Sequence, residues 1–229
     1  MNTYNRIVAA LLGGFMWLAL PSHTHANLLV NGSFETPVVP VGSFSLFNSG
    51  STGITGWTVV GLQVGVVSGT FTQNGISFPA QDGVQWVDLT GLNTNTVEGV
   101  QQTVSTTPNT TYTLSYFVGN VVNPGGIFGT TSTVNVLVNG GPIQTATNSG
   151  GGTTQTWQQF TTSFVATTAS TTIGFFNGDP STDNANGLDN VSLDLAATTA
   201  VPEPSTWLLL GSGMIGLMFW QRRYHSHQR

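Results

Sequence analysis

Residues 110–119 read Thr-Thr-Tyr-Thr-Leu-Ser-Tyr-Phe-Val-Gly, a run in which large apolar side chains alternate with other residues. The apolar positions are Tyr112, Leu114, Tyr116 and Val118, and this period of two is typical of a β-strand with one buried face. The same alternation recurs at 134–138 and 160–164, and turn-forming residues such as Asn139-Gly-Gly-Pro142 end the runs. No stretch before the C-terminal tail has helical periodicity. The pattern therefore predicts an all-β, two-sheet sandwich over residues 27–200.

The first 26 residues have the order of a secretory signal peptide. Arg6 precedes a continuous apolar stretch, Ile7–Leu20, and a short polar run ends at Ala26 with small residues at the cleavage positions. We therefore expect signal peptidase to cleave after Ala26. An uncleaved N-terminal anchor is the alternative.

Charge is distributed very unevenly along the chain of 229 residues. The sequence has no lysine and no cysteine, and its four arginines and four histidines all lie before residue 27 or after residue 203. All nine carboxylates lie between these limits, so the exported region is strictly acidic. Nucleic acids and anionic lipids need clustered basic side chains, which excludes them as partners of this region. Without disulfides, the domain must be held by its core, and a bound cation is a candidate for further support.

The C-terminal 29 residues, 201–229, form a separate unit. Pro202, Glu203 and Pro204 come first, and then an uncharged apolar run, Thr206–Trp220, is followed by a tail with three arginines. This order predicts a transmembrane helix whose cationic end is cytoplasmic. Fifteen residues of helix cover only about 22 Å of a hydrocarbon layer about 30 Å thick. The short length favours a temporary signal; an ordinary tail anchor and a buried helix are the alternatives.

The Val201-Pro-Glu-Pro-Ser205 motif, the apolar helix and the terminal arginines together resemble the PEP-CTERM sorting signal. The resemblance implies processing at Pro202–Pro204 by exosortase, a membrane protease and transpeptidase. It also implies a Gram-negative bacterium that exports polysaccharide. The precursor would then be held in the inner membrane transiently, and the mature protein would reach the cell surface or extracellular matrix.

Ordered landmarks between residues 27 and 195 resemble the galactose-binding-like jelly rolls, which include certain carbohydrate-binding modules and domains of plant cell-wall proteins. The landmarks are Asn27-Leu-Leu-Val-Asn-Gly-Ser-Phe-Glu35, Ile54-Thr-Gly-Trp57, Asp82-Gly-Val-Gln-Trp-Val-Asp-Leu89, Val100-Gln-Gln-Thr-Val104 and Leu188-Asp-Asn-Val-Ser-Leu193. The resemblance implies that the opening and closing segments lie side by side, often around a structural calcium ion.

Oxygen ligands for such a cation are available. The candidates are Glu35 and Asp189, at the two ends of the domain, with Asp179 and Asp183 in an Asn- and Asp-rich stretch before the closing strand. That stretch does not match the EF-hand pattern, because no glutamate closes it. An Asx-rich turn between two strands is the alternative interpretation.

Three tryptophans could stack on sugar rings, namely Trp57, Trp86 and Trp157. At strand spacing an aromatic side chain is more often core than platform. Trp86 alternates with Gln85 and Val87 along the expected strand, so we expect one of the two faces of this strand to be exposed to solvent. We therefore predict that Gln85, Trp86 and Asp88 border a ligand surface and that Trp157 is core.

Residue types restrict the possible chemistry. The exported region lacks the histidine, cysteine and lysine that activate nucleophiles, which argues against the usual triads. Glu35 and Glu98 are the only glutamates that could form a glycosidase pair. We expect a non-enzymatic jelly-roll domain that associates with extracellular polysaccharide. A structural or adhesive matrix protein without specific glycan binding is the first alternative, and a carboxylate-dependent glycoside hydrolase is the second.

Overall fold

The computed structural model describes residues 27–92, 97–181, 183–197, 210–215 and 217. The predicted signal peptide, including Ala26, and the processing residues Pro202, Glu203 and Pro204 lie outside these ranges. Residues 210–215 and 217 are helical. Across the described ranges, no helix has both the length and the apolar character needed to cross a membrane. Most of the predicted helix Thr206–Trp220 falls outside them.

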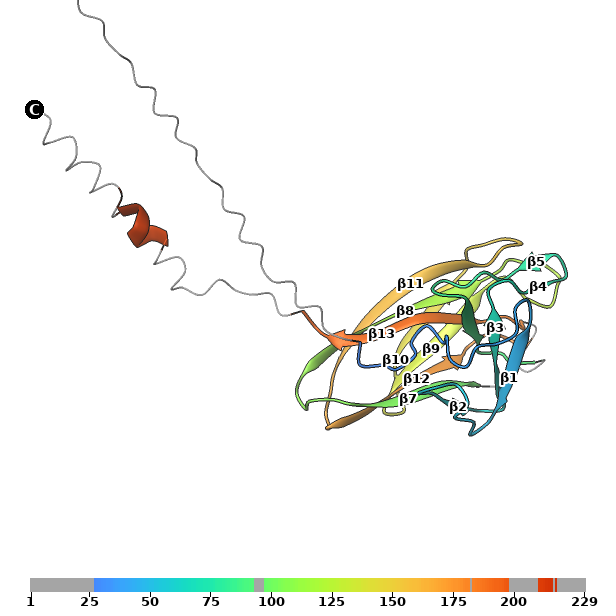
Figure 1. Cartoon of the computed structure of the whole chain (residues 1–229), viewed down its shortest axis with the longest axis horizontal. Helices are drawn as coiled ribbons and strands as arrows, with labels where there is room; N and C mark the ends of the chain where they lie inside the picture. Colours follow the sequence, from blue (N-terminus) through green and yellow to red (C-terminus); the bar gives the residue numbers. More distant parts are fainter. Residues whose placement is uncertain (1–26, 93–96, 182, 198–209, 216, 218–229) are drawn as a thin grey trace, which may run out of the picture.

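Two antiparallel sheets form the domain (Figure 1), which confirms the predicted all-β sandwich. The larger sheet has the strand order β1-β3-β6-β13-β8-β11, and the smaller has the order β10-β9-β12-β7-β2. A separate hairpin pairs β4 with β5. The strands are β1 (Phe44–Asn48), β2 (Thr58–Val60), β3 (Gln63–Ser68), β4 (Thr72–Gln73), β5 (Ile76–Ser77), β6 (Gln85–Asp88), β7 (Gly99–Ser105), β8 (Thr111–Asn120), β9 (Ser132–Val138), β10 (Gly141–Asn148), β11 (Thr156–Val165), β12 (Ser170–Asn177) and β13 (Gly187–Leu195).

The main core lies between the two sheets, and β8 shows how the sequence builds it. Tyr112, Leu114, Tyr116 and Val118 are buried in this core, as the alternation predicts.

Turn residues determine how β9 and β10 are connected. Asn139 and Gly140 both have positive φ, at 49° and 79°, as a two-residue hairpin between β9 and β10 requires.

The two ends of the domain lie side by side. The amide of Leu28 donates to the carbonyl of Leu193 at 2.9 Å, and the amide of Val191 donates to Gly32 at 2.9 Å. The predicted neighbourhood of the opening and closing segments is therefore confirmed. The opening segment is irregular, since Asn31 has a φ of 56°. It is tied to β13 by side-chain as well as backbone bonds, including a 2.9 Å contact between the Leu193 amide and the Asn27 side chain.

A second hydrophobic cluster covers the opposite face of the larger sheet. Val66 and Val87 point into the main core, whereas the adjacent Val67 and Trp86 belong to this second cluster. The hairpin β4–β5 and the segment that carries Phe128 pack over it. The outer face of the larger sheet is thus partly covered, and this cover shapes the candidate site.

Candidate functional site

Strand register aligns six residues across the outer face of the larger sheet. Directly paired positions run from β1 to β11 in the order Leu46, Gly65, Asp88, Gly187, Gly119 and Trp157. Three of the six positions are glycines, so the face is hollow around Asp88. A glycine within a strand commonly marks such a close approach or a gap in packing.

Trp157 fills one side of this hollow and leaves the other side open. A Cβ added at Gly119 would lie 2.7 Å from Cζ3 of the Trp157 ring, and one at Gly187 would lie 3.0 Å from Cη2. In contrast, a Cβ at Gly65 would meet nothing closer than 3.7 Å. The open space is therefore on the Gly65 side of Asp88.

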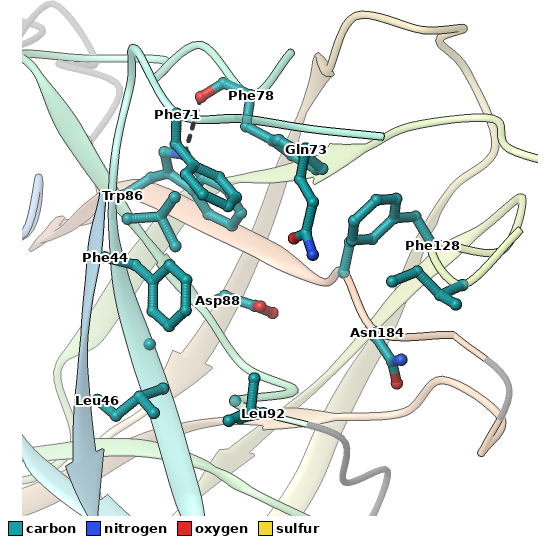
Figure 2. A pocket seen from close by; sticks show the side chains of 15 residues that line it. Phe44, Leu46, Phe71, Gln73, Phe78, Trp86, Asp88, Leu92, Phe128 and Asn184 are labelled. Carbon is teal, nitrogen blue, oxygen red and sulfur yellow. Dashed lines mark hydrogen bonds between the residues drawn. The ribbon is translucent and has the colours of Figure 1, made fainter. Parts of the chain in front are cut away.

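This space is a pocket of about 90 Å³ walled mainly by aromatic rings (Figure 2). It has room for one compact organic group rather than a chain of sugars. Phe78, Trp86 and Phe128 are buried, while Leu92 and Ile127 are exposed at the rim. The full lining is Phe44, Leu46, Gly65, Val67, Phe71, Gln73, Phe78, Trp86, Asp88, Gly91, Leu92, Ile127, Phe128, Asn184 and Ala185.

The aromatic wall is held together by ring contacts. Phe71 stacks on Phe78 with centroids 5.7 Å apart, and Phe78 meets Phe128 edge-on at 5.1 Å. Phe44 packs edge-on against Phe71 at 5.4 Å. The indole N–H of Trp86 donates to the carbonyl of Phe78 at 3.1 Å, so its position is fixed and its donor is used. These contacts preform the pocket before any ligand arrives.

Asp88 is the one carboxylate that lines the pocket. Its Oδ1 accepts hydrogen bonds from the Thr90 amide at 3.0 Å, the Thr90 hydroxyl at 2.8 Å and the Asn186 amide at 3.1 Å. The carboxylate points into the space between the rings (Figure 2). Burial raises the pKa of Asp88 to about 7, and repulsion from Glu98 adds to this effect. The three hydrogen bonds favour the ionised form and lower the pKa, but they do not offset the burial. Asp88 can therefore change charge near neutral pH.

The structure separates the three residues that were predicted to border a ligand surface. Trp86 and Asp88 line the pocket, but Gln85 does not. The amide group of Gln85 instead bonds the opening segment: it accepts from Val39 at 3.0 Å and donates to the carbonyl of Pro37 at 2.7 Å. Neighbouring residues of a strand point to opposite faces, which is why only alternate ones reach the pocket.

The other tryptophans also have defined places. Trp57 belongs to the main core, with its indole N–H bonded to the carbonyl of Asn31 at 3.0 Å. Trp157 is partly buried and packs edge-on against Trp86 at a centroid distance of 5.9 Å, which agrees with a packing role.

Glu35 and Asp189 bind the same loop from two sides. Asp189 Oδ2 accepts from the amides of Gln81 at 2.8 Å and Asp82 at 3.0 Å. Glu35 Oε1 accepts from the amides of Val84 at 2.9 Å and Gln85 at 3.1 Å. Burial raises the pKa of Asp189 to about 7 even though three backbone amides favour its ionised form. Backbone N–H groups thus bind the carboxylate oxygens of Glu35 and Asp189, which were predicted from the sequence to bind a cation.

Asp179 and Asp183 form a second acidic group, between β12 and β13. Burial raises the pKa of Asp179 to about 8, with repulsion from Asp183 as the next cause, and burial raises that of Asp183 to about 7. Both interact electrostatically with Asp88, so the group lies behind one wall of the pocket. The described residues contain no set of three or more carboxylate or histidine side chains placed to hold a metal ion.

The proposed glycosidase pair is not brought together by any contact within the described residues. Glu35 bonds the loop 81–85, whereas Glu98 is fully buried and its carbonyl accepts from the amide of Asn177. Asp88, not Glu35, is the carboxylate that interacts with Glu98.

Sequence reasoning missed most of the aromatic wall, namely Phe44, Phe71, Phe78 and Phe128, and the gap at Gly65. One signal was available for the gap. Gly65 interrupts an otherwise valine-rich strand, Gln63–Ser68, and an isolated glycine of this kind marks a close approach or missing packing. The rings carry no comparable local signal, because they converge only through long-range register.

Three solved structures illustrate the likeness in fold. A cyclase from Fischerella sp. TAU, in complex with 4-(1H-indol-3-yl)butan-2-one, has a TM-score of 0.53 at 18% identity and covers 76% of this chain and 100% of its own. A family 16 carbohydrate-binding module has a TM-score of 0.44 at 21% identity, and the match covers 73% of this chain and 99% of the module. A CBM22-1 xylan-binding domain from Paenibacillus barcinonensis has a TM-score of 0.42 at 17% identity, and the match covers 70% of this chain and 99% of that domain. At these identities the likeness concerns the fold alone.

Sequence comparisons divide the chain at the end of the sandwich. No curated protein matches the sequence. The PEP-CTERM protein-sorting motif matches residues 200–223, which confirms the predicted signal and indicates an exported protein whose membrane-anchored precursor is sorted to the cell envelope. The profile of DUF642, described as a protein of unknown function, matches residues 27–194. The chain therefore belongs to the DUF642 family, with a PEP-CTERM sorting motif behind its jelly-roll domain.

Proposed function

We propose that the jelly-roll domain associates with extracellular polysaccharide and that the aromatic pocket is its point of contact. The pocket carries the proposal. It combines ring faces with three converging polar side chains, Asp88, Gln73 and Asn184, which is the composition of a small-molecule binding site. A flat apolar ring face meets the axial hydrogens of a pyranose, and the carboxylate and amides accept or donate to its hydroxyl groups. The sorting motif supports delivery to the envelope, where such polymers are exposed.

The pocket size limits the mode of contact. A volume of about 90 Å³ admits one compact group, so the domain would hold a chain end or a side branch rather than a long segment. The exposed aliphatic rim, with Leu46, Leu92 and Ile127, would then lie against the next residue of the chain. This mode predicts preference for terminal or branching sugars.

The domain acts without catalysis in this proposal. The sequence supplies no histidine, cysteine or lysine between residues 27 and 203, so a nucleophile has no basic partner there. The carboxylate in the pocket, Asp88, is engaged by Thr90 and Asn186 through one oxygen. Its role is to bind rather than to cleave.

A structural role without specific glycan binding has its own support. The exposed strand faces carry hydroxyl side chains that bond one another, as in Thr103 with Thr172 at 2.8 Å and Thr133 with Thr147 at 3.1 Å. Such self-satisfied pairs make a polar surface that needs no ligand. Under this reading the acidic domain stays soluble and is bridged by cations.

A calcium ion between Glu35 and Asp189 is part of our proposal for stability. The two carboxylates converge on residues 81–85, and no basic side chain of this acidic region can neutralise them. Asp82 also repels Asp189, and a divalent cation with added backbone oxygens would offset negative charge gathered at this loop.

A glycan array probed with residues 27–200, together with the producer's own exopolysaccharide, separates the two functions. Binding to a defined class of sugars, lost when the pocket is narrowed by Gly65→Val, supports the proposal. A flat response to every sugar, including the producer's own polymer, would favour the structural role.

A further inference from the structure

The aromatic pocket surrounds a carboxylate that has no basic partner in its domain. The rings of Phe44, Phe71, Phe78 and Phe128 line the space beside Asp88, with Trp86 behind them. All arginines and histidines lie before residue 27 or after residue 203, and the chain has no lysine. A positive charge for this pocket must therefore come from outside the domain.

The two oxygens of Asp88 are not equivalent. All three of its hydrogen bonds within the described residues go to Oδ1, from Thr90 and Asn186. Figure 2 shows the carboxylate directed into the space between the rings, and its Oδ2 accepts none of these hydrogen bonds. A ligand can therefore reach one carboxylate oxygen without displacing a protein donor.

The surroundings select the kind of cation. A metal ion needs several oxygen ligands, and Asp88 is the one carboxylate among the residues that line this pocket. Ring faces instead attract organic cations, whose charge is spread over methyl or methylene groups. A neutral ligand would leave an ionised, desolvated carboxylate without compensation, which is costly.

We propose that this pocket binds a ligand through a compact ammonium group, held between the aromatic rings and the free oxygen of Asp88. The inference rests on the proposed function in one respect, since a polysaccharide would present this chemistry as a free amine on an amino sugar. A small quaternary or primary ammonium compound would present the same group without a sugar. The shared chemistry is the ammonium, and the two sources are separable by experiment.

The charge of Asp88 makes the binding depend on pH. Burial and the nearby Glu98 hold the pKa of Asp88 near 7, and Asp179 and Asp183 also interact with it. A permanently charged quaternary ammonium keeps its charge throughout, so only the protein titrates. Its affinity should rise about tenfold or more from pH 5.5 to pH 8, because ionised Asp88 is the binding form.

The test uses matched pairs of ligands on residues 27–197, which contain all thirteen strands and both hydrophobic clusters. Choline is compared with its uncharged tert-butyl isostere, and glucosamine with glucose, by calorimetry at pH 8. We expect each ammonium ligand to bind at least about tenfold more tightly than its neutral partner. Asp88→Asn keeps the acceptor for Thr90 and Asn186 but removes the charge, and should abolish the preference. Asp194→Asn, an equal change of charge outside the pocket lining, should leave it intact.

The outcomes separate this inference from the proposed function. Equal binding of choline and its isostere, or a preference that survives Asp88→Asn, overturns the ammonium site. Binding of neutral sugars in the pocket without ammonium preference also overturns it and leaves the proposed function standing. Binding of choline but not of glucosamine supports the ammonium site and counts against the glycan as its source. Failure of choline and glucosamine to bind overturns the ammonium site, and the glycan array then decides the proposed function by itself.

Discussion

Asp179→Asn should stabilise the domain at neutral pH. The side chain is 7% exposed, and its Oδ1 accepts a hydrogen bond from the amide of Thr133. Its Oδ2 is buried and has no hydrogen-bond partner within the described residues. Asparagine keeps the acceptor and removes the charge, so it imitates the protonated acid without needing a proton.

The magnitude follows from proton linkage. Burial and Asp183 raise the pKa of Asp179 from 3.8 to about 8. A carboxyl whose pKa is higher in the folded state contributes stability that is fully present below the unfolded value. That stability is lost as the pH rises through the folded value. At pH 7, keeping Asp179 protonated in the folded state lowers the free energy of unfolding of the wild-type chain by about 4 kcal/mol at most. Because Asp179 is coupled to Asp183, we expect the variant to recover about 2–4 kcal/mol of this stability.

Thermal unfolding followed by tryptophan fluorescence, in chelator, measures this effect. For a domain of this size the melting temperature should rise by about 5–15 °C at pH 7. The rise should be much smaller at pH 4, which is close to the unfolded pKa of 3.8, because keeping Asp179 protonated in the folded state then costs little. Asp194→Asn is the matched change of charge on β13 and should shift the melting temperature little. A loss of stability in Asp179→Asn at pH 7, or an equal gain at pH 4 and pH 7, would show that the buried Asp179 carboxyl does not cost the domain stability in this way.

Three further predictions concern packing, calcium and processing. Gly119→Ala should lower the free energy of unfolding by about 1–3 kcal/mol, because the added Cβ would lie 2.7 Å from the Trp157 ring. Gly65→Ala should fold normally, because its Cβ would meet no atom closer than 3.7 Å. Urea unfolding of both variants measures the difference. Millimolar calcium should raise the melting temperature by about 5–10 °C if it reaches a hundred times its dissociation constant, and Glu35→Gln or Asp189→Asn should remove most of the rise; identical curves in calcium and chelator would rule the ion out. Mass spectrometry of surface-released protein should find the chain cut near the Pro-Glu-Pro motif, and an intact arginine tail on mature material would disprove processing there.

The sequence was a good guide to strands and a poor guide to the pocket. Alternation in β8 correctly predicted the buried faces of Tyr112 and Leu114, because that signal is local. The opening segment 28–31 is irregular despite its apolar residues, since Asn31 adopts a positive φ and its side chain bonds the carbonyls of Thr36 and Thr55. Side-chain bonds to the backbone compete with strand pairing at such positions.

The site depends on pairings that no short window contains. Alternation around Trp86 predicts that one face is exposed to solvent, but the structure buries Gln85, Trp86 and Val87 alike, at 1% exposed or less. The alternation also does not say which of these side chains borders the pocket. The answer requires the order β1-β3-β6-β13, which sets Gly65 opposite Asp88 and Asp88 opposite Gly187. Trp86 and Asp88 then face outward, while Gln85 bonds the opening segment. Register between distant strands is decided by the whole hydrophobic pattern, so it could not be predicted from the motif alone.

The most direct test of the glycan contact is an NMR titration of the isotope-labelled domain, residues 27–197, with oligosaccharides from the producer's own exopolysaccharide. If the pocket is the contact, the side-chain amides of Gln73 and Asn184 and the backbone amide of Asp88, all around the pocket, will show saturable shift changes. Resonances of Thr145 and Thr172, on the smaller sheet, should stay unchanged. Saturable changes confined to the smaller sheet, or no change at any oligosaccharide concentration, would contradict the pocket as the domain's glycan contact.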